Sequence, residues 1–141
     1  MNLELSKGYS KYLDVPYKHM GRDRKGWDCY GLYRYVLQEC MGKTVGSFAD
    51  AYQNNGTKEA DATIHAVLRT GEARGWQRVQ RGEEVEGDGI VFLLAGEPMH
   101  CGYVITPGTM LHCMRGRGTC IERYDNIAWT KRIEGLYKWN S

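Results

Sequence analysis

The stretch Trp27-Asp28-Cys29-Tyr30-Gly31 places a cysteine at the start of a predicted helix. Asp28 is a favourable N-cap residue, so Cys29 falls in the first turn. Backbone N–H groups are unpaired there, and the positive end of the helix dipole favours a thiolate over a thiol. The helix is expected to run to about Met41-Gly42, because apolar residues recur at the spacing of one helix face: Leu32, Tyr33, Val36, Leu37 and Cys40.

Two histidines, His100 and His112, follow far downstream in sequence typical of β-strands. A thiol nucleophile requires an imidazole as its base and a group that orients this imidazole. The two histidines are 12 positions apart and lie on either side of a predicted turn at Thr106-Pro107-Gly108-Thr109. A two-residue loop alone would place them on opposite faces of the hairpin, whereas an odd loop or one bulge places them on the same face. A joint catalytic role requires the second arrangement, which sends Cys101 and Cys113 to the other face as buried, small apolar residues.

The order of elements predicts an α+β fold, with N-terminal helices packed on an antiparallel sheet, in a single domain over residues 1–141. A short helix is expected over residues 8–13 and a further helix over 56–71, separated by the Cys29 helix. Alternating apolar residues with Gly- and Pro-containing turns predict the strands that follow. These are Trp76–Val79, Ile90–Leu94, Cys101–Ile105, Met110–Met114, Thr119–Tyr124 and Ile133–Trp139.

Composition excludes several classes of protein. The 141 residues, 42% hydrophobic and 26% charged, are typical of a globular domain. A net charge of +2 gives no electrostatic basis for binding nucleic acid or an anionic membrane. No apolar run of about 18 residues predicts membrane insertion, and the N-terminus lacks the apolar region of a signal peptide. Five cysteines without paired spacing predict reduced thiols in a protein made in the cytoplasm.

Residues of metal-binding type also gather in the C-terminal half of the chain: His100, Cys101, His112, Cys113 and Cys120. No Cys-x-x-Cys or His-x-x-x-His pair occurs among them, and strand alternation separates His100 from Cys101. The sequence therefore predicts no metal site, and it contains no feature that calls for a cofactor.

Five segments occur in a definite order along the chain: Val15-Pro16-Tyr17, Asp28-Cys29-Tyr30-Gly31, Gly87-Asp88-Gly89-Ile90-Val91-Phe92, His100-Cys101-Gly102-Tyr103-Val104 and Met110-Leu111-His112. Together they resemble the NlpC/P60 family of papain-like cysteine peptidases. Within that family, the Tyr- and Arg-containing Cys helix and the His-Cys-Gly strand are most similar to stand-alone peptidases of phage and prophage tail modules. One residue departs from the commoner motif, because Tyr30 stands where the family usually has Ser.

The resemblance implies a catalytic set and a substrate. Cys29 would be the nucleophile, His100 the base and His112 the residue that orients His100. The implied reaction is hydrolysis of a peptide through a Cys29 thioester. The implied substrate is the stem peptide of Gram-negative peptidoglycan, cut at the γ-D-glutamyl–diaminopimelate bond.

The resemblance also suggests where the substrate binds and how the enzyme reaches it. Tyr17, Asp28 and Tyr30 flank the nucleophile and are the candidate substrate-binding residues. Tail-tip proteins of a phage or prophage are the implied partners. A tail assembled in the cytoplasm would carry the protein, without a signal peptide, to the periplasm and cell envelope.

Two alternatives stay open on the sequence alone. One is a structural subunit of the tail tip that keeps the fold without turnover, against which the intact set of Cys29, His100 and His112 argues. The other is a cysteine-dependent amidase or acyltransferase acting on a different substrate, because related folds host several acyl transfers.

Overall fold

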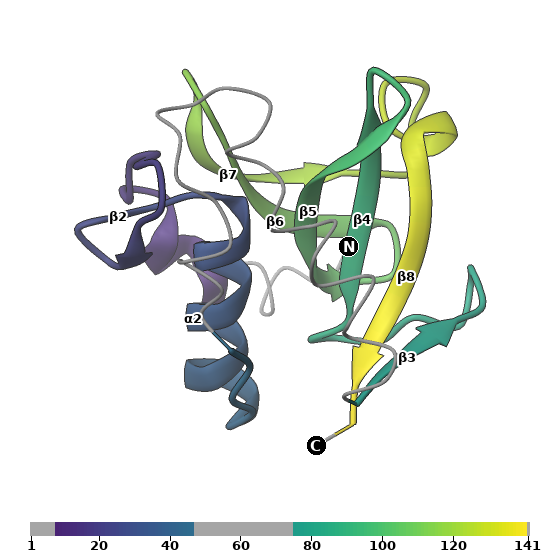
Figure 1. Ribbon diagram of the computed structural model, residues 1–141, viewed down its shortest axis with the longest axis horizontal. Coiled ribbons are helices and arrows are strands. Elements are labelled where there is room, and N and C mark those ends of the chain that lie inside the picture. The colour runs from purple at the N-terminus through teal and green to yellow at the C-terminus, as the bar shows by residue number, and fades with distance from the viewer. Residues whose placement is uncertain (1–7, 47–74, 141) are drawn as a thin grey trace.

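The computed structural model describes residues 8–46 and 75–140. In these ranges a helix, α2 (Cys29–Met41), lies beside a strongly curved antiparallel sheet (Figure 1). No helix in the described ranges combines the length and apolar character needed to cross a membrane. The predicted α+β fold is confirmed, and the helix predicted over 56–71 lies outside the described residues.

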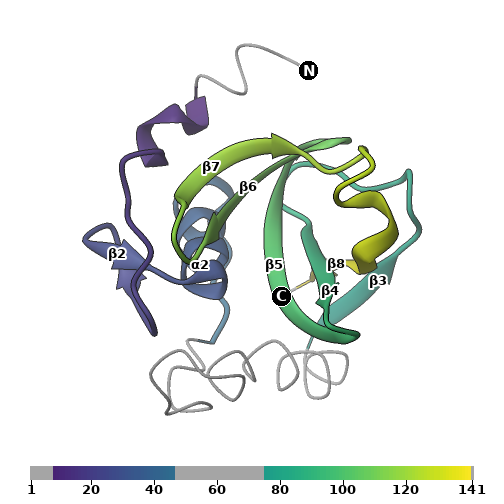
Figure 2. The same cartoon turned by 90° about the horizontal axis from the view of Figure 1, so that it is seen from above.

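The sheet has six strands in the order β3-β8-β4-β5-β6-β7. Their bounds are β3 Trp76–Val79, β4 Gly89–Leu94, β5 Glu97–Thr106, β6 Thr109–Met114, β7 Gly118–Arg123 and β8 Ile133–Trp139. Each matches a predicted strand, although β5 begins earlier than expected and so includes His100. The view from above shows β5, β6 and β7 curving past α2, with β4 and β8 farther from the helix (Figure 2).

The ends of α2 are set by the residues that the sequence predicted. The Asp28 side chain accepts a hydrogen bond from the Gly31 backbone N–H at 2.8 Å, which makes it the N-cap. Gly42 ends the helix in the left-handed conformation, with φ of 68°, a geometry that glycine adopts without steric cost. Leu32 and Val36 are fully buried in the apolar cluster that α2 shares with the sheet.

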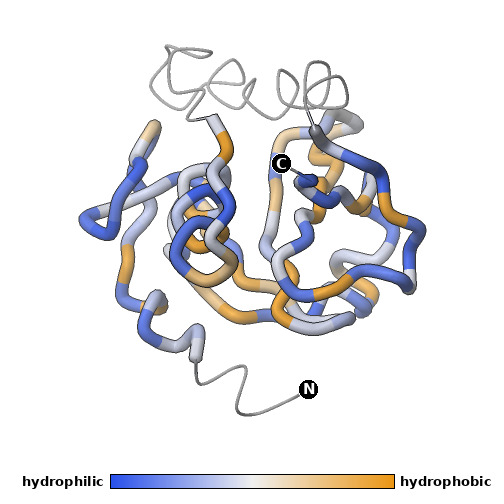
Figure 3. The backbone as a smooth tube through the Cα atoms, turned by 90° about the horizontal axis from the view of Figure 1, so that it is seen from below, coloured by the Kyte–Doolittle hydropathy of each residue, from blue (hydrophilic) through white to orange (hydrophobic). Residues whose placement is uncertain are grey.

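The segment before α2 differs in detail from the prediction. A 3₁₀ turn, η1 (Ser10–Tyr12), stands where a short helix was expected. The polar loop forms a two-stranded ribbon of β1 (Arg22–Asp23) and β2 (Gly26–Trp27), whose hydrophilic turn projects from the molecule (Figure 3). The ribbon packs so closely on α2 that a Cβ at Gly31 would lie 2.0 Å from the Gly21 carbonyl oxygen. Only glycine fits at position 31 without backbone movement.

The sheet separates two apolar clusters. The first lies between α2 and the sheet and includes Trp27, Cys29, Cys101 and Cys113. The second lies on the other face and contains Ile90, Phe92, Val104, Met110, Tyr124, Trp129 and Leu136. Strand alternation therefore decides which side chains can meet the helix that carries Cys29.

Candidate active site

The β5–β6 hairpin brings His100 and His112 together. Thr106 pairs with Thr109 across a two-residue loop, and the register shifts between Val104 and Thr106. This bulge places both histidines on one face, which the tight loop alone would prevent. His100 Nε2 lies 2.8 Å from His112 Nδ1. The geometric condition predicted for a joint role of the two histidines is therefore met.

Glu122 on β7 extends this pair into a chain of three side chains, because its Oε1 lies 2.8 Å from His112 Nε2. Burial raises the pKa of Glu122, but hydrogen bonds from Trp129 and His112 outweigh that effect and lower it below its usual value. The ionised carboxylate can only accept, so His112 carries its proton on Nε2 and accepts at Nδ1. His100 then donates from Nε2, which leaves its Nδ1 as the unprotonated nitrogen.

His100 is buried against aromatic rings of the second cluster. Its ring stacks on Trp129 with centroids 5.8 Å apart and lies 5.7 Å from its cross-strand neighbour Phe92. Burial lowers the pKa of His100 to about 3, and the proximity of His112 adds to this shift. His100 is therefore neutral at physiological pH, which is the form able to accept a proton.

The thiol of Cys29 lies on the helix side of β5, and its side chain is nearly buried. The hydrogen bond with Cys29, together with burial, raises the pKa of Cys101 far above its usual range. Cys101 and His100 are consecutive residues in a regular part of β5, so their side chains point to opposite faces. The structure thus joins His100 to His112 and holds the Cys29 thiol against Cys101, across the strand from them. The assignment of all three as catalytic residues stays a prediction.

Two of the predicted substrate-binding residues have structural partners. Asp28 caps α2 and also receives a hydrogen bond from Arg22 Nη1 at 2.9 Å, so its carboxylate ties the ribbon to the helix. Tyr30 is buried and donates its hydroxyl proton to the Gly46 carbonyl at 2.6 Å. These contacts give both side chains a role in positioning the start of α2.

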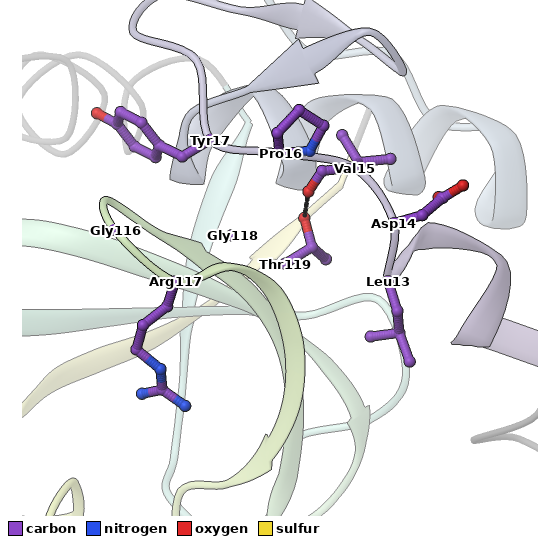
Figure 4. Close-up of a pocket in the computed structure, with 9 residues that line it drawn as sticks. All are labelled: Leu13, Asp14, Val15, Pro16, Tyr17, Gly116, Arg117, Gly118 and Thr119. Carbon is purple, nitrogen blue, oxygen red and sulfur yellow. Dashed lines mark hydrogen bonds between the residues drawn. The ribbon is translucent and has the colours of Figure 1, made fainter.

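Tyr17, the third predicted residue, borders a pocket of about 430 Å³. The pocket lies between residues 13–17 and residues 116–119 (Figure 4). Arg115 Nη2 lies 3.2 Å from the Tyr17 hydroxyl, and its guanidinium stands 5.2 Å from the centre of the Tyr17 ring. Tyr17 therefore borders a space able to receive a ligand.

Thr119 holds the two walls of this pocket together. Its hydroxyl donates to the Val15 carbonyl at 2.8 Å and accepts from the Trp27 indole N–H at 2.8 Å. Figure 4 shows the first of these bonds crossing from β7 to the segment before α2. One buried hydroxyl thus links the sheet to both the Tyr17 segment and the residue two positions before Cys29.

Replacing Thr119 by Val is expected to lower the free energy of unfolding by about 1–3 kcal/mol, measured by urea denaturation. The change keeps the shape but leaves the Trp27 indole N–H without its buried acceptor, and the Val15 carbonyl keeps only its bond from the residue 119 backbone N–H. Thr119→Ser, which retains the hydroxyl, is the control and should lose much less stability. A Thr119→Val variant as stable as wild type, with the loss confined to Thr119→Ser, would show that the methyl group and not the hydroxyl carries the effect.

These observations define the class of the protein: an α+β fold of papain-like type, with a cysteine at the start of a helix packed on an antiparallel sheet. The sequence profile of the NlpC/P60 family matches residues 14–137. The chain belongs to the NlpC/P60 family.

Solved structures confirm this fold. The NlpC/p60 domain of the peptidoglycan hydrolase SagA superposes with a TM-score of 0.61 at 19% identity, over 98% of this chain and 99% of that domain. An NlpC/P60 family protein from Bacillus cereus gives a TM-score of 0.68 at 19% identity, over 97% of this chain and 39% of that protein.

A sequence relative, Protein P54 of Enterococcus faecium, is 29% identical over 91 residues. The match covers 54% of this chain and only 18% of Protein P54. This chain therefore corresponds to a small part of that relative.

Proposed function

We propose that this protein is a cysteine peptidase that hydrolyses the stem peptides of peptidoglycan. The observation that carries the proposal is the placement of Cys29 in the first turn of a capped helix, beside the strand that bears His100 and its hydrogen-bonded chain. Membership of the NlpC/P60 family and the likeness to a domain of a peptidoglycan hydrolase support it.

The proposed reaction runs through a thioester. His100 Nδ1 takes the proton of Cys29, and the thiolate attacks the carbonyl carbon of the scissile bond. Backbone N–H groups at the start of α2 stabilise the oxyanion. His100 then gives the proton to the leaving amine and activates the water that hydrolyses the thioester. His112 and Glu122 hold the His100 ring and keep its Nδ1 free for these transfers.

The first step requires Cys29 to exchange one partner for another. Its thiol contacts Cys101 in this structure, whereas proton transfer needs contact with the His100 imidazole. Catalytic hydrogen bonds often form only when the substrate is bound. Because the two side chains lie on opposite sides of β5 in this structure, we assign to substrate binding the local rearrangement that brings the Cys29 sulfur to the His100 ring.

The charge around the Tyr17 pocket favours an acidic substrate. Arg115 contacts the Tyr17 hydroxyl, and Arg117, whose side chain is more than half exposed, lines the same pocket. Guanidinium groups bind carboxylates with charge-assisted hydrogen bonds. Stem peptides carry free carboxylates at their D-glutamyl and diaminopimelate residues, which makes the γ-D-glutamyl–diaminopimelate bond the proposed site of cleavage.

We further propose that a phage or prophage tail delivers the enzyme. This extends the likeness of the Cys helix and the His-Cys-Gly strand to the peptidases of tail modules. Tail-tip proteins would be its partners, and the protein would pass from the cytoplasm to the cell envelope with the tail. The contact between Cys29 and Cys101 also favours a second candidate, a tail-tip subunit without turnover, because a thiol held by another thiol is not activated.

Digestion of purified Gram-negative sacculi separates these functions. The wild-type protein is expected to release fragments that mass spectrometry identifies as cut between D-glutamate and diaminopimelate. Protein treated with iodoacetamide is the control and should release none. Fragments cut at another bond would correct the substrate assignment, and no release from wild type would favour the structural subunit.

A further inference from the structure

Three side chains of different types converge at the outer end of the histidine chain. His112 Nε2 lies 2.8 Å from Glu122 Oε1 and 3.3 Å from Cys120 Sγ, and the sulfur lies 3.9 Å from the same carboxylate oxygen. The register of β6 and β7 creates this cluster, because His112 pairs directly with Cys120. Glu122 lies two residues farther along β7 and therefore on the same face.

We propose that His112, Cys120 and Glu122 form a Zn²⁺ site with a fourth position open to solvent. Nitrogen, sulfur and carboxylate oxygen are the ligands that zinc takes in proteins. Zinc bonds of about 2.0–2.3 Å in a tetrahedron place ligand atoms roughly 3.3–3.8 Å apart. The separations of 2.8, 3.3 and 3.9 Å differ from this range by about half an ångström or less, which side-chain rotation accommodates.

The surroundings of the cluster are suited to hold a metal. The His112 side chain is fully buried, packs edge-on against Trp129 and has its Nδ1 fixed by His100. A hydrogen bond of this kind on the second nitrogen orients a metal-binding imidazole. The Glu122 side chain is 25% exposed, so an ion can enter from solvent.

A cation already occupies part of this space. Arg117 Nη1 lies 3.7 Å from Glu122 Oε1, and its Nη2 lies 3.9 Å from Cys120 Sγ. The Arg117 side chain is 56% exposed and can turn into solvent when the ion binds. Zn²⁺ would replace the charge of Arg117, and the loss of the Cys120 thiol proton would offset the extra positive charge, so the cluster keeps its electrostatic balance.

Zinc at this site changes the position of a proton on His100, a consequence that rests on the proposed function. The ion takes the lone pair of His112 Nε2, so the proton of His112 moves to Nδ1. His100 Nε2 must then accept, and the proton of His100 resides on Nδ1. The histidine pair keeps two protons, and the one proton released comes from the Cys120 thiol. The nitrogen proposed as the base is thereby blocked, so zinc inhibits hydrolysis.

Cobalt(II), a spectroscopic substitute for zinc, tests the site without any turnover. The background is Cys29→Ser, which removes the thiol at the start of α2 from the assay. One equivalent of cobalt is expected to bind, with a sulfur-to-cobalt charge-transfer band and the visible absorption of a tetrahedral ion. Adding Cys120→Ser should abolish the band and weaken zinc binding, measured by competition, by at least about 100-fold. Adding Cys40→Ser, at an exposed cysteine, should change neither.

Two further measurements sharpen the test. Arg117→Ala should tighten zinc binding roughly tenfold, because a competing charge about 4 Å from two ligands is removed.

Zinc should inhibit wild-type digestion of sacculi but not that by Cys120→Ser, whose folding is checked by its melting temperature. Absence of bound cobalt, or a band that survives Cys120→Ser, would overturn the site. Equal inhibition of both proteins by zinc would overturn the proposed proton shift on His100. If wild type showed no turnover, the proposed function would be refuted, and cobalt binding alone would decide whether the metal site exists.

Discussion

Cys29→Ala is expected to reduce kcat for peptide hydrolysis by a factor on the order of 10⁴ or more, as removal of a nucleophile does in other acyl-transfer enzymes. No other group in the proposed reaction can form the thioester. Folding should be unaffected, because alanine fits the first turn of α2 and the Asp28 cap does not depend on the sulfur. The rate is measured on soluble stem peptide, and folding is checked by thermal denaturation.

Cys101→Ala is the matched control for this experiment. Cys101 lies in the same cluster and contacts the Cys29 thiol, but it has no part in the reaction. Its removal takes away the thiol that holds Cys29 in this structure, so activity should be kept or increased. Full activity in Cys29→Ala, or a loss in Cys101→Ala as large as that in Cys29→Ala, would contradict the choice of nucleophile.

Gly31→Ala should destabilise the protein by about 3 kcal/mol. Its Cβ would lie 2.0 Å from the Gly21 carbonyl oxygen and 3.1 Å from the Trp27 side chain. The first of these atoms belongs to the backbone, so the β1–β2 ribbon must move away from the helix. The melting temperature should fall by roughly 10 °C for a chain of this size.

Gly8→Ala provides the control, because a Cβ at Gly8 has no atom within 4 Å. Its melting temperature should stay close to that of wild type. If Gly31→Ala were equally stable, the close approach of the ribbon to α2 would be wrong. The glycine two residues after the nucleophile would then need another explanation.

The elements of the sheet could be predicted because their signals are local. Alternation and turn residues located the strand Trp76–Val79 and the strand Ile133–Trp139 at their observed bounds. Asp28 and Gly42 marked the ends of α2 through capping. The β1–β2 ribbon was missed because strands of two residues have no periodicity to detect.

The site could be predicted only in part, because it depends on register and on faces. The sequence indicated His100 and His112, and strand alternation showed that a bulge in the hairpin would place them on one face. No local signal in the sequence marks where a bulge occurs. Glu122 and Cys120 meet His112 only because β6 and β7 pair in one particular register. Spacing rules for metal sites search along a chain and therefore pass over ligands that meet across strands.

The position of β8 has a consequence for the newly made chain. This last strand lies between β3 and β4, and Thr119 bonds to Val15 from 104 positions away. The Cys29 helix therefore leaves the ribosome long before the strands that cover it exist. At about 5–20 residues per second, roughly 5–20 seconds pass before β8 can close the sheet. During that interval the thiol is open to oxidation, so reducing conditions become part of what allows this protein to mature.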